Sequence, residues 1–273
     1  ALRPPAIAAA AYVPVLYGAT VADRDRIVAY LDDLLDAGGW EDYGPNGLQV
    51  PGAAQVDRIV TAVSAHQELF ERAASSGAQM VLCHHGIFWG GPLGPIDARM
   101  KRRLQTLFDA DLSLVAYHLP LDAHAEVGNN ALICARLGFE RSEPFAEHRG
   151  RAIGWVGRSA APVPVDELLG RCRELFGRDD VLHFPGGPAA VGALGVVSGG
   201  GAGDLEAAAA LGLDAFLTGE PSEPAMADAR ELGLHFIAAG HWATETFGIR
   251  RIGELVASEF GVEHEFVALP NPV

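Results

Sequence analysis

The stretch RIVTAVSAHQELFERAASSGAQMVLCHH, from Arg58 to His85, decides the fold. Its opening, RIVTAVSA, is an apolar run of the length and composition of a buried strand. The segment HQELFERAASSG has apolar residues at helical spacing and ends at Gly77, and AQMVLCHH is a second apolar run. The stretch therefore predicts a strand–helix–strand unit of an α/β protein.

The chain on either side of this unit continues the pattern. An amphipathic helix begins at Val21 and stops at a Gly-Gly pair, and the turn-rich segment EDYGPNGLQVPG after it predicts a loop. After the unit come a helix over residues 98–109, the strand LSLVAYH and the helix NNALICARLG. Residues 149–188 then supply an extra strand, a helix over residues 165–176 and another strand.

A second half repeats this order. The segments VGALGVVSGG, LDAFLTGE and LHFIAAGH predict strands, and GDLEAAAALG, EPAMADARELG and TFGIRRIGELVASEFG predict the helices that follow them. Two details go beyond shared order: SSGAQMVLCHH resembles ALGLDAFLTGE, and the third strand of each half ends in a histidine with a carboxylate four residues on. These pairs are His118 with Asp122 and His241 with Glu245. We interpret the repetition as an internal duplication.

The duplication predicts the fold class. We expect an α/β protein of two similar halves, with mixed sheets flanked by helices, in which the ends of corresponding strands face one cleft. The expected division is an N-terminal arm, residues 1–20; a first α/β domain, residues 21–127 with 236–273; and a second α/β domain, residues 128–235.

Composition sets the class of protein. The 273 residues are 49% hydrophobic, enough for a large core, and no apolar run reaches the roughly 18 to 20 residues that a membrane-spanning helix needs. The three cysteines, Cys83, Cys134 and Cys172, are odd in number and widely spaced, which argues against a disulfide framework and favours a reducing cytoplasm. A formal charge of −15 opposes binding to duplex nucleic acid. We therefore expect a soluble cytoplasmic protein without a nucleic-acid or membrane partner.

Polar side chains at the carboxyl ends of strands mark where α/β proteins usually bind ligands. Here such residues form a nitrogen and oxygen ligand set without thiolates, which suits Zn, Mn, Fe, Co or Ni. Six residues exceed what one tetrahedral ion needs, and a carboxylate can bridge two ions roughly 3.5 to 4 Å apart. The set predicts a two-metal site formed by His84, His85, His118, Asp122, His241 and Glu245.

Each ligand has a simpler alternative. Adjacent residues of a regular strand point to opposite faces, so His84 and His85 can both be ligands only if the chain leaves strand geometry there. Gly86 permits that departure; otherwise the pair is two polar residues where a buried strand leaves the core. Asp122 has the alternative of a helix cap. His241 and Glu245 would share one face of a helical first turn.

Six motifs, namely NGLQV, LCHHGIFW, HLPLDAH, SGGGAGD, FLTGE and GHWATE, occur in one order along the chain. In this order they resemble the dinuclear-metal-centre proteins named GTP cyclohydrolase 1 type 2, also called Nif-three-like, over nearly the whole chain after the N-terminal segment. The resemblance implies that two divalent cations bind to five residues, with His85 and Asp122 on one ion, His84 and His241 on the other, and Glu245 bridging.

The family ligand set does not include His118, so we assign His118 to orienting Asp122 or contacting substrate. The resemblance further implies a homohexameric ring, such as a trimer of dimers, with the metal sites facing its interior. Longer members of the family insert an extra domain between the halves, and this chain lacks that insertion.

The activity that the resemblance implies is hydrolysis. Two cations would activate a water that attacks C8 of a purine nucleotide such as GTP, or a related heterocycle, with release of formate. His118 and Glu220 are candidates for moving protons, although Glu220 has the alternative of supporting its loop. A metal-dependent phosphoesterase and a non-enzymatic metal-binding ring or scaffold are the competing hypotheses.

Candidate substrate-binding residues come from two loops. Free backbone N–H groups in SGGGAGD would hold an anion, with a tight turn that lets a helix pack against the sheet as the alternative. The motif has neither the dinucleotide-binding spacing nor the phosphate-loop lysine, so no cofactor other than the cations is expected. The predicted substrate residues are Asn46, Gln49, Ser198, Gly199 and Gly201. For Asn46 and Gln49, the alternative is a turn-forming role.

Overall fold

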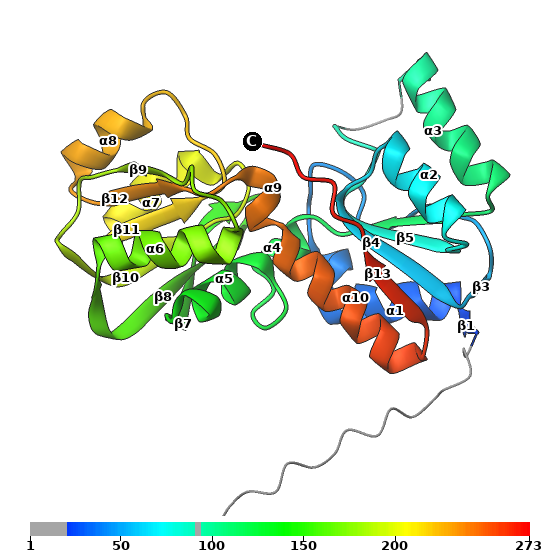
Figure 1. Cartoon of the computed structure of the whole chain (residues 1–273), viewed down its shortest axis with the longest axis horizontal. Helices are drawn as coiled ribbons and strands as arrows, with labels where there is room; N and C mark the ends of the chain where they lie inside the picture. Colours follow the sequence, from blue (N-terminus) through cyan, green and yellow to red (C-terminus); the bar gives the residue numbers. More distant parts are fainter. Residues whose placement is uncertain (1–20, 91–93) are drawn as a thin grey trace, which may run out of the picture.

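The computed structural model describes residues 21–90 and 94–273, so the predicted N-terminal arm, residues 1–20, lies outside the described residues. Figure 1 shows two α/β lobes, each built around one sheet that helices cover. This architecture confirms the predicted fold class of mixed sheets flanked by helices. Among the described residues, no helix is long and apolar enough to cross a bilayer.

The first lobe contains a five-stranded sheet in the order β13-β4-β5-β6-β2, in which β2 alone runs antiparallel to its neighbour. Alternate strand residues face opposite helical layers: Ile59 and Leu82 pack with α1 and α10, and Val60 and Val81 pack with α2 and α3. The bounds are α1 Arg24–Leu35, β2 Gly47–Val50, β4 Arg58–Ser64, α2 Gln67–Ser75, β5 Met80–His85, α3 Ala98–Asp109, β6 Ser113–Ala116, α10 Thr246–Phe260 and β13 Glu263–Phe266. A short ladder of β1, Ala22–Asp23, with β3, Gln55–Val56, lies beside them.

The second lobe contains a six-stranded sheet in the order β7-β8-β10-β11-β12-β9, with β10, β11 and β12 parallel. Leu217 faces the layer of α5 and α6, and Phe216 faces the layer of α7 and α8. The bounds are α5 Asn129–Leu137, β7 Glu140–His148, β8 Arg151–Pro164, α6 Val165–Phe176, β9 Leu182–Phe184, β10 Ala190–Val196, α7 Leu205–Ala210, β11 Ala215–Thr218, α8 Ala225–Leu232 and β12 His235–Ala238.

The chain crosses between the lobes twice. After β6 of the first lobe, helix α5 packs on β8 and β10 of the second lobe, and after β12 of the second lobe, helix α10 packs on β4 of the first. The crossing segments begin with two short helices, α4, Leu119–Ala123, and α9, His241–Thr244. Each lobe thus receives a helix from the other half of the sequence, and the two crossings lie in the middle of the molecule (Figure 1).

Three local predictions differ from the structure. The segment EDYGPNGLQVPG, expected to be a loop, contains β2, because Leu48 and its neighbours pair with β6 at the sheet edge. Strand β7 was not indicated, since its sequence ERSEPFAEH is mostly charged, as suits an edge strand. We expected the first domain to resume at residue 236, but β12 pairs with β11 and β9 in the second sheet. Whether the lobes are separate domains stays a prediction.

Candidate metal centre

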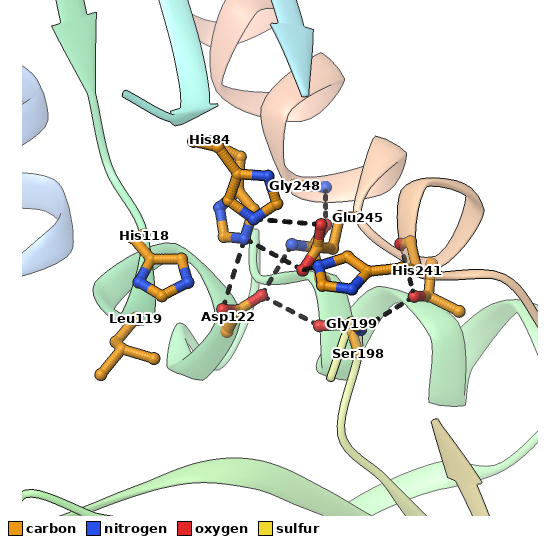
Figure 2. Close-up of polar contacts among 12 residues, drawn as sticks. His84, His118, Leu119, Asp122, Ser198, Gly199, His241, Glu245 and Gly248 are labelled. Carbon is orange, nitrogen blue, oxygen red and sulfur yellow. Dashed lines mark hydrogen bonds and ion pairs between the residues drawn. The ribbon is translucent and has the colours of Figure 1, made fainter. Parts of the chain in front are cut away.

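The predicted ligands come from three chain segments that meet between the lobes. His84 and His85 end β5, the central parallel strand of the first sheet. The other predicted ligands belong to the two crossings, with Asp122 in α4 and Glu245 directly after α9. Figure 2 shows the side chains of His84, Asp122, His241 and Glu245 pointing toward one another. The duplication therefore has a direct consequence, because each crossing delivers one carboxylate to a shared site.

Glu245 is the centre of this cluster. Its Oε1 lies 3.1 Å from His241 Nε2 and 3.5 Å from His84 Nε2, and its Oε2 lies 3.3 Å from His85 Nε2. Asp122 Oδ2 lies 3.5 Å from His84 Nε2. The structure thus brings together all five residues that the resemblance implies. Strand β5 continues to His85, so the chain does not leave strand geometry before the pair. His84 and His85, the last two residues of the strand, nevertheless both contact Glu245.

The contacts divide the ligands differently from the resemblance. They group His84 with Asp122, and they place His85 close to His241 and Glu245. In both divisions Glu245 is the shared residue. The assignment of particular histidines to particular ions stays a prediction.

Among the described residues, two buried atoms of the cluster make no hydrogen bond, although each lies 3.3 to 3.5 Å from a group of the opposite kind: His84 Nε2 and Glu245 Oε2. Burying a polar atom without a partner costs free energy, and nearly all such atoms in proteins are paired. Both are ligand atoms of the kind that divalent transition metals bind. The residues present therefore fit a metal site, and a bound cation would satisfy both atoms.

The outer nitrogen of each clustered histidine is held by a second group. His84 Nδ1 donates to the carbonyl oxygen of Tyr117 at 3.0 Å, and His241 Nδ1 donates to Glu220 Oε1 at 3.0 Å. His85 Nδ1 hydrogen-bonds with Ser64 Oγ, also at 3.0 Å. These contacts direct each Nε2 inward, the arrangement that orients metal-binding histidines in proteins. Glu220, a candidate for moving protons or for supporting its loop, thus contacts His241, and its role stays a prediction.

Asp122 is oriented in the same way. Its Oδ1 accepts hydrogen bonds from Asn129 Nδ2 at 2.8 Å and from Ser198 Oγ at 2.9 Å, which leaves Oδ2 facing His84. Ser198, expected to contact substrate, lines the cavity but also fixes a candidate ligand. Because Ser198 follows β10 and Asp122 lies in α4, this bond also joins the two lobes.

His118 has a partner that the sequence did not reveal. Its Nδ1 lies 2.7 Å from Oδ1 of Asp42, a residue of the loop after α1. We predicted that His118 orients Asp122 or contacts substrate; the described side chains that hydrogen-bond to Asp122 are Asn129 and Ser198 instead. Burial alone would raise the pKa of Asp42, but hydrogen bonds from His118 and Asn46 hold it below the usual value. His118 thus has one nitrogen fixed by a carboxylate, while its ring lines the cavity 5.1 Å from the His84 ring and 5.6 Å from the His85 ring.

Asn46, which precedes β2, and Gln49, which belongs to β2, do not line the cavity, contrary to our expectation. Asn46 donates to Asp42 and accepts the backbone N–H of His118, so it supports the His118 pair. Gln49 accepts the backbone N–H of Ile87 and packs against Gly86, where a side chain would collide with its amide. Asn46 thus fixes the backbone at His118, and Gln49 fixes the backbone that follows His85.

The turn SGGGAGD does not offer free donors at the positions we predicted. The backbone N–H of Ser198 donates to Asn130, that of Gly199 donates to Thr244, and that of Gly201 donates to Thr218. The alternative of a tight turn is the better description of these residues, because their donors hold the turn against the surrounding structure.

Gly199 nevertheless has a constraint that involves the cluster. Its φ is +63°, and a Cβ added there would collide with Glu245 Oε1 and lie 3.1 Å from His241 Nε2. Gly199→Ala should therefore displace Glu245 and lower the affinity for divalent cations about 10- to 100-fold, as loss of outer contacts does in other metal sites. Gly203→Ala, in the same turn with no atom within 4 Å of its added Cβ, is the matched control. Unchanged metal affinity in Gly199→Ala, measured by titration calorimetry, would contradict this geometry.

Without metal, the cluster balances its charges with protons. Burial would lower the pKa of His84, but Asp122 and Glu245 raise it to about 9. Burial likewise opposes protonation of His241, whereas Glu245 and Glu220 raise its pKa to about 9. Burial would raise the pKa of Glu245, yet the surrounding histidines hold it well below its usual value. Protons thus occupy the positions of a cation, and a binding metal must displace them.

We expect metal-free protein to lose stability as the pH rises above neutrality. The pKa of His84 and of His241 is about 9 in the folded protein against 6.5 for an unperturbed histidine, so their contribution is full below pH 6.5 and is lost as the pH rises towards 9. Thermal unfolding in the presence of a chelator, at several pH values between 6.5 and 8, measures how steeply the unfolding temperature falls with pH. His241→Gln should flatten this slope. His66→Gln should not, because burial lowers the pKa of His66. An unchanged slope in His241→Gln would refute the expectation.

A cavity of about 550 Å³ opens onto the cluster. Four of the five predicted metal ligands line it, namely His85, Asp122, His241 and Glu245, and the cavity extends to both lobes. The lining side chains that bear on the chemistry are Tyr43, His85, Trp89, Arg103, His118, Asp122, His148, Ser198, His241 and Glu245. A small organic molecule of nucleotide size would therefore reach the histidines and carboxylates from this side.

The chain matches the family profile described as Duf34/NIF3 (NGG1p interacting factor 3) over residues 22–272. It is 43% identical over 246 residues to a Pseudomonas aeruginosa protein named GTP cyclohydrolase 1 type 2 homolog, which covers 90% of this chain and 97% of that protein. An Escherichia coli protein of the same name is 41% identical over 245 residues, which covers 89% of this chain and 96% of that protein.

Solved structures share the two-lobed fold. The structural-genomics protein ybgI, described as of unknown function, has a TM-score of 0.86 at 39% identity, and a Thermus thermophilus protein has a TM-score of 0.82 at 37% identity. Each match covers 92% of this chain and 100% of the other. Reduced HcgD from Methanocaldococcus jannaschii, with a TM-score of 0.79 over 91% of this chain and 99% of that one, is 19% identical and shares the fold alone.

Proposed function

The chain belongs to the Duf34/NIF3 family, and from this premise we propose that it is a hydrolase that uses two divalent cations to act on a purine nucleotide or a related heterocycle. The observation that supports it best is a pair of buried ligand atoms that make no hydrogen bond within the described part of the chain, His84 Nε2 and Glu245 Oε2, beside a cavity of about 550 Å³. Relatives named GTP cyclohydrolase 1 type 2 homolog point to ring hydrolysis in particular.

Five side chains would hold the cations: His84, His85, Asp122, His241 and Glu245. Bound there, two cations would lower the pKa of a water molecule and stabilise the negative charge that develops on the substrate. The anionic Glu245 is in contact with three histidines and is therefore the natural shared residue.

The remaining cavity residues would handle protons. Because His118 Nδ1 bonds to Asp42, its Nε2 is the nitrogen left to accept or return a proton. The carboxylate fixes the orientation and the tautomer of the His118 ring, as in other histidine–carboxylate pairs. Glu220 is already engaged with His241, so we propose His118, and not Glu220, for proton transfer.

Product analysis tests the proposal. Protein reconstituted with Zn, Mn, Fe, Co or Ni is analysed for metal content and then incubated with GTP and other nucleotides, with formate and phosphate measured in the same sample. Formate without phosphate supports ring hydrolysis. Phosphate without formate favours the phosphoesterase. Neither product, from protein that holds two ions per chain, favours a metal-binding scaffold, and far fewer than two ions per chain contradicts the two-metal site.

The homohexameric ring that the resemblance implies and the cytoplasmic location that the cysteines favour also stay predictions. Sedimentation of the purified protein checks the first of them.

A further inference from the structure

Arg103 extends the cavity beyond the metal cluster. It belongs to α3, which packs against α2 on the outer face of the first sheet, and its side chain lines the same cavity as His85 and His118. Among the described residues that line this cavity, it is the one arginine or lysine. A negative group on a molecule bound there would therefore find in Arg103 a side chain that is charged at every physiological pH.

The Nε of Arg103 is buried and has no hydrogen-bond acceptor among the described residues. Asp97, at the start of α3, is near enough to favour the charge of Arg103, but no ion pair or hydrogen bond joins the two side chains. Other arginines that are largely shielded from solvent do have carboxylates: Arg24 pairs with Asp25, and Arg178 pairs with Asp180. In a chain with 35 acidic and 20 basic side chains, an unpaired and partly buried arginine is an exception. Leaving its donors unmet costs free energy unless a ligand supplies the acceptors.

An aromatic ring lies in the same cavity. Trp89 is 46% exposed, and its ring forms T-shaped contacts with the rings of His85 and His118, with centroids 5.7 and 5.2 Å apart. Its indole nitrogen donates to the carbonyl of Gly86, which fixes the ring. An exposed, oriented indole favours stacking with a planar heterocycle.

We propose that Arg103 binds a phosphoryl group of the substrate while the heterocycle lies near Trp89 and the histidine cluster. This inference rests on the proposed function for the position of the reacting ring. The planar guanidinium presents several donors in one plane, which matches phosphate oxygens. The turn SGGGAGD, the other candidate for an anion, has its donors at Ser198, Gly199 and Gly201 already engaged, whereas the buried Nε of Arg103 has no acceptor among the described residues. The substrate class is thus a phosphorylated heterocycle and not a free base or nucleoside.

Binding measurements with two probes test the proposal. Titration calorimetry compares GTP with guanosine on the full chain, with and without added divalent cation. We expect wild-type protein to bind GTP more tightly than guanosine. Arg103→Met, which keeps the aliphatic stem and removes the charge, should weaken GTP binding about 10- to 100-fold and leave guanosine binding within about twofold. Arg103→Lys should regain part of the loss, because an ammonium keeps the charge without the planar fork.

Controls separate recognition from folding. Arg102→Met changes an exposed neighbour on the same helix and should bind both probes as wild type does. Thermal unfolding and metal content of Arg103→Met should match those of wild type. If they do not, the comparison of the two variants is the test, and Arg103→Lys should bind GTP more tightly than Arg103→Met. Equal GTP binding by wild type and Arg103→Met overturns the proposal, and so does wild-type protein that binds GTP no better than guanosine.

The outcome is independent of the hydrolase assay. Weaker GTP binding by Arg103→Met, without formate from wild-type protein, leaves the phosphate site standing and refutes ring hydrolysis of GTP. Formate released equally by both proteins, at equal GTP affinity, leaves hydrolysis standing and refutes the role of Arg103.

Discussion

Glu245→Gln is expected to lower the affinity for divalent cations by at least about 100-fold and to reduce any formate release to background. The carboxylate is 4% exposed, contacts His84, His85 and His241, and has a pKa far below its usual value, so it is an anion inside the protein. Glutamine has nearly the same shape but no charge, and its NH2 group cannot serve as a ligand. Elemental analysis after dialysis measures bound metal, and calorimetry measures affinity.

The matched control is Glu206→Gln, an exposed carboxylate of α7 that is not part of the cluster. It should keep metal content and turnover. A Glu245→Gln protein that still holds two ions per chain would show that the shared carboxylate is not a ligand, and the two-metal proposal would fail with it. If wild-type protein also lacks turnover while Glu245→Gln loses metal, the site is structural, as the scaffold hypothesis requires.

Elements with strong local signals were predicted from the sequence with close bounds. The helix over residues 98–109 begins after Asp97, whose side chain accepts a backbone N–H of the first turn, and the helix over residues 165–176 ends at Gly177 in the left-handed region. The histidines that follow β5 and β6 could also be found from the sequence, because each strand ends close to the point where its apolar run ends. In each case, neighbours in the sequence supply the physical cause.

What the sequence concealed depends on contacts between distant segments. Asp42 lies in a turn-rich loop 76 residues before His118, and no spacing rule joins the two. Arg103 belongs to the basic segment MKRRLQ, in which nothing distinguishes the arginine that faces the cavity from its exposed neighbour. Strand β2 forms because β6 offers an open edge, not because GLQV itself favours a strand. Such features become visible only once the tertiary fold places the partners together.

The pair of Asp42 and His118 should control turnover without controlling metal binding. We expect His118→Gln to lower kcat about 10²- to 10⁴-fold, the range that a positioned acid–base group contributes. Asp42→Asn should also lower kcat, because both oxygens of Asp42 accept hydrogen bonds, so the NH2 group of an asparagine would face a donor on either side and disturb the fixed tautomer of His118. The double variant should be little worse than His118→Gln alone, since residues that act as a unit are not additive.

Metal content decides whether this assignment is right. A ring nitrogen of His118 lies within 4.8 Å of ligand atoms of His84 and His85, so His118 could instead be a further ligand. If His118→Gln retains two ions per chain while its pH–rate profile loses the limb that reports a base, proton transfer is supported. If the variant loses metal in proportion to activity, His118 is a ligand and its assignment as the base is wrong. His148→Gln changes another histidine of the cavity wall, one that pairs with Asp204 outside the cluster, and should alter neither metal content nor the profile.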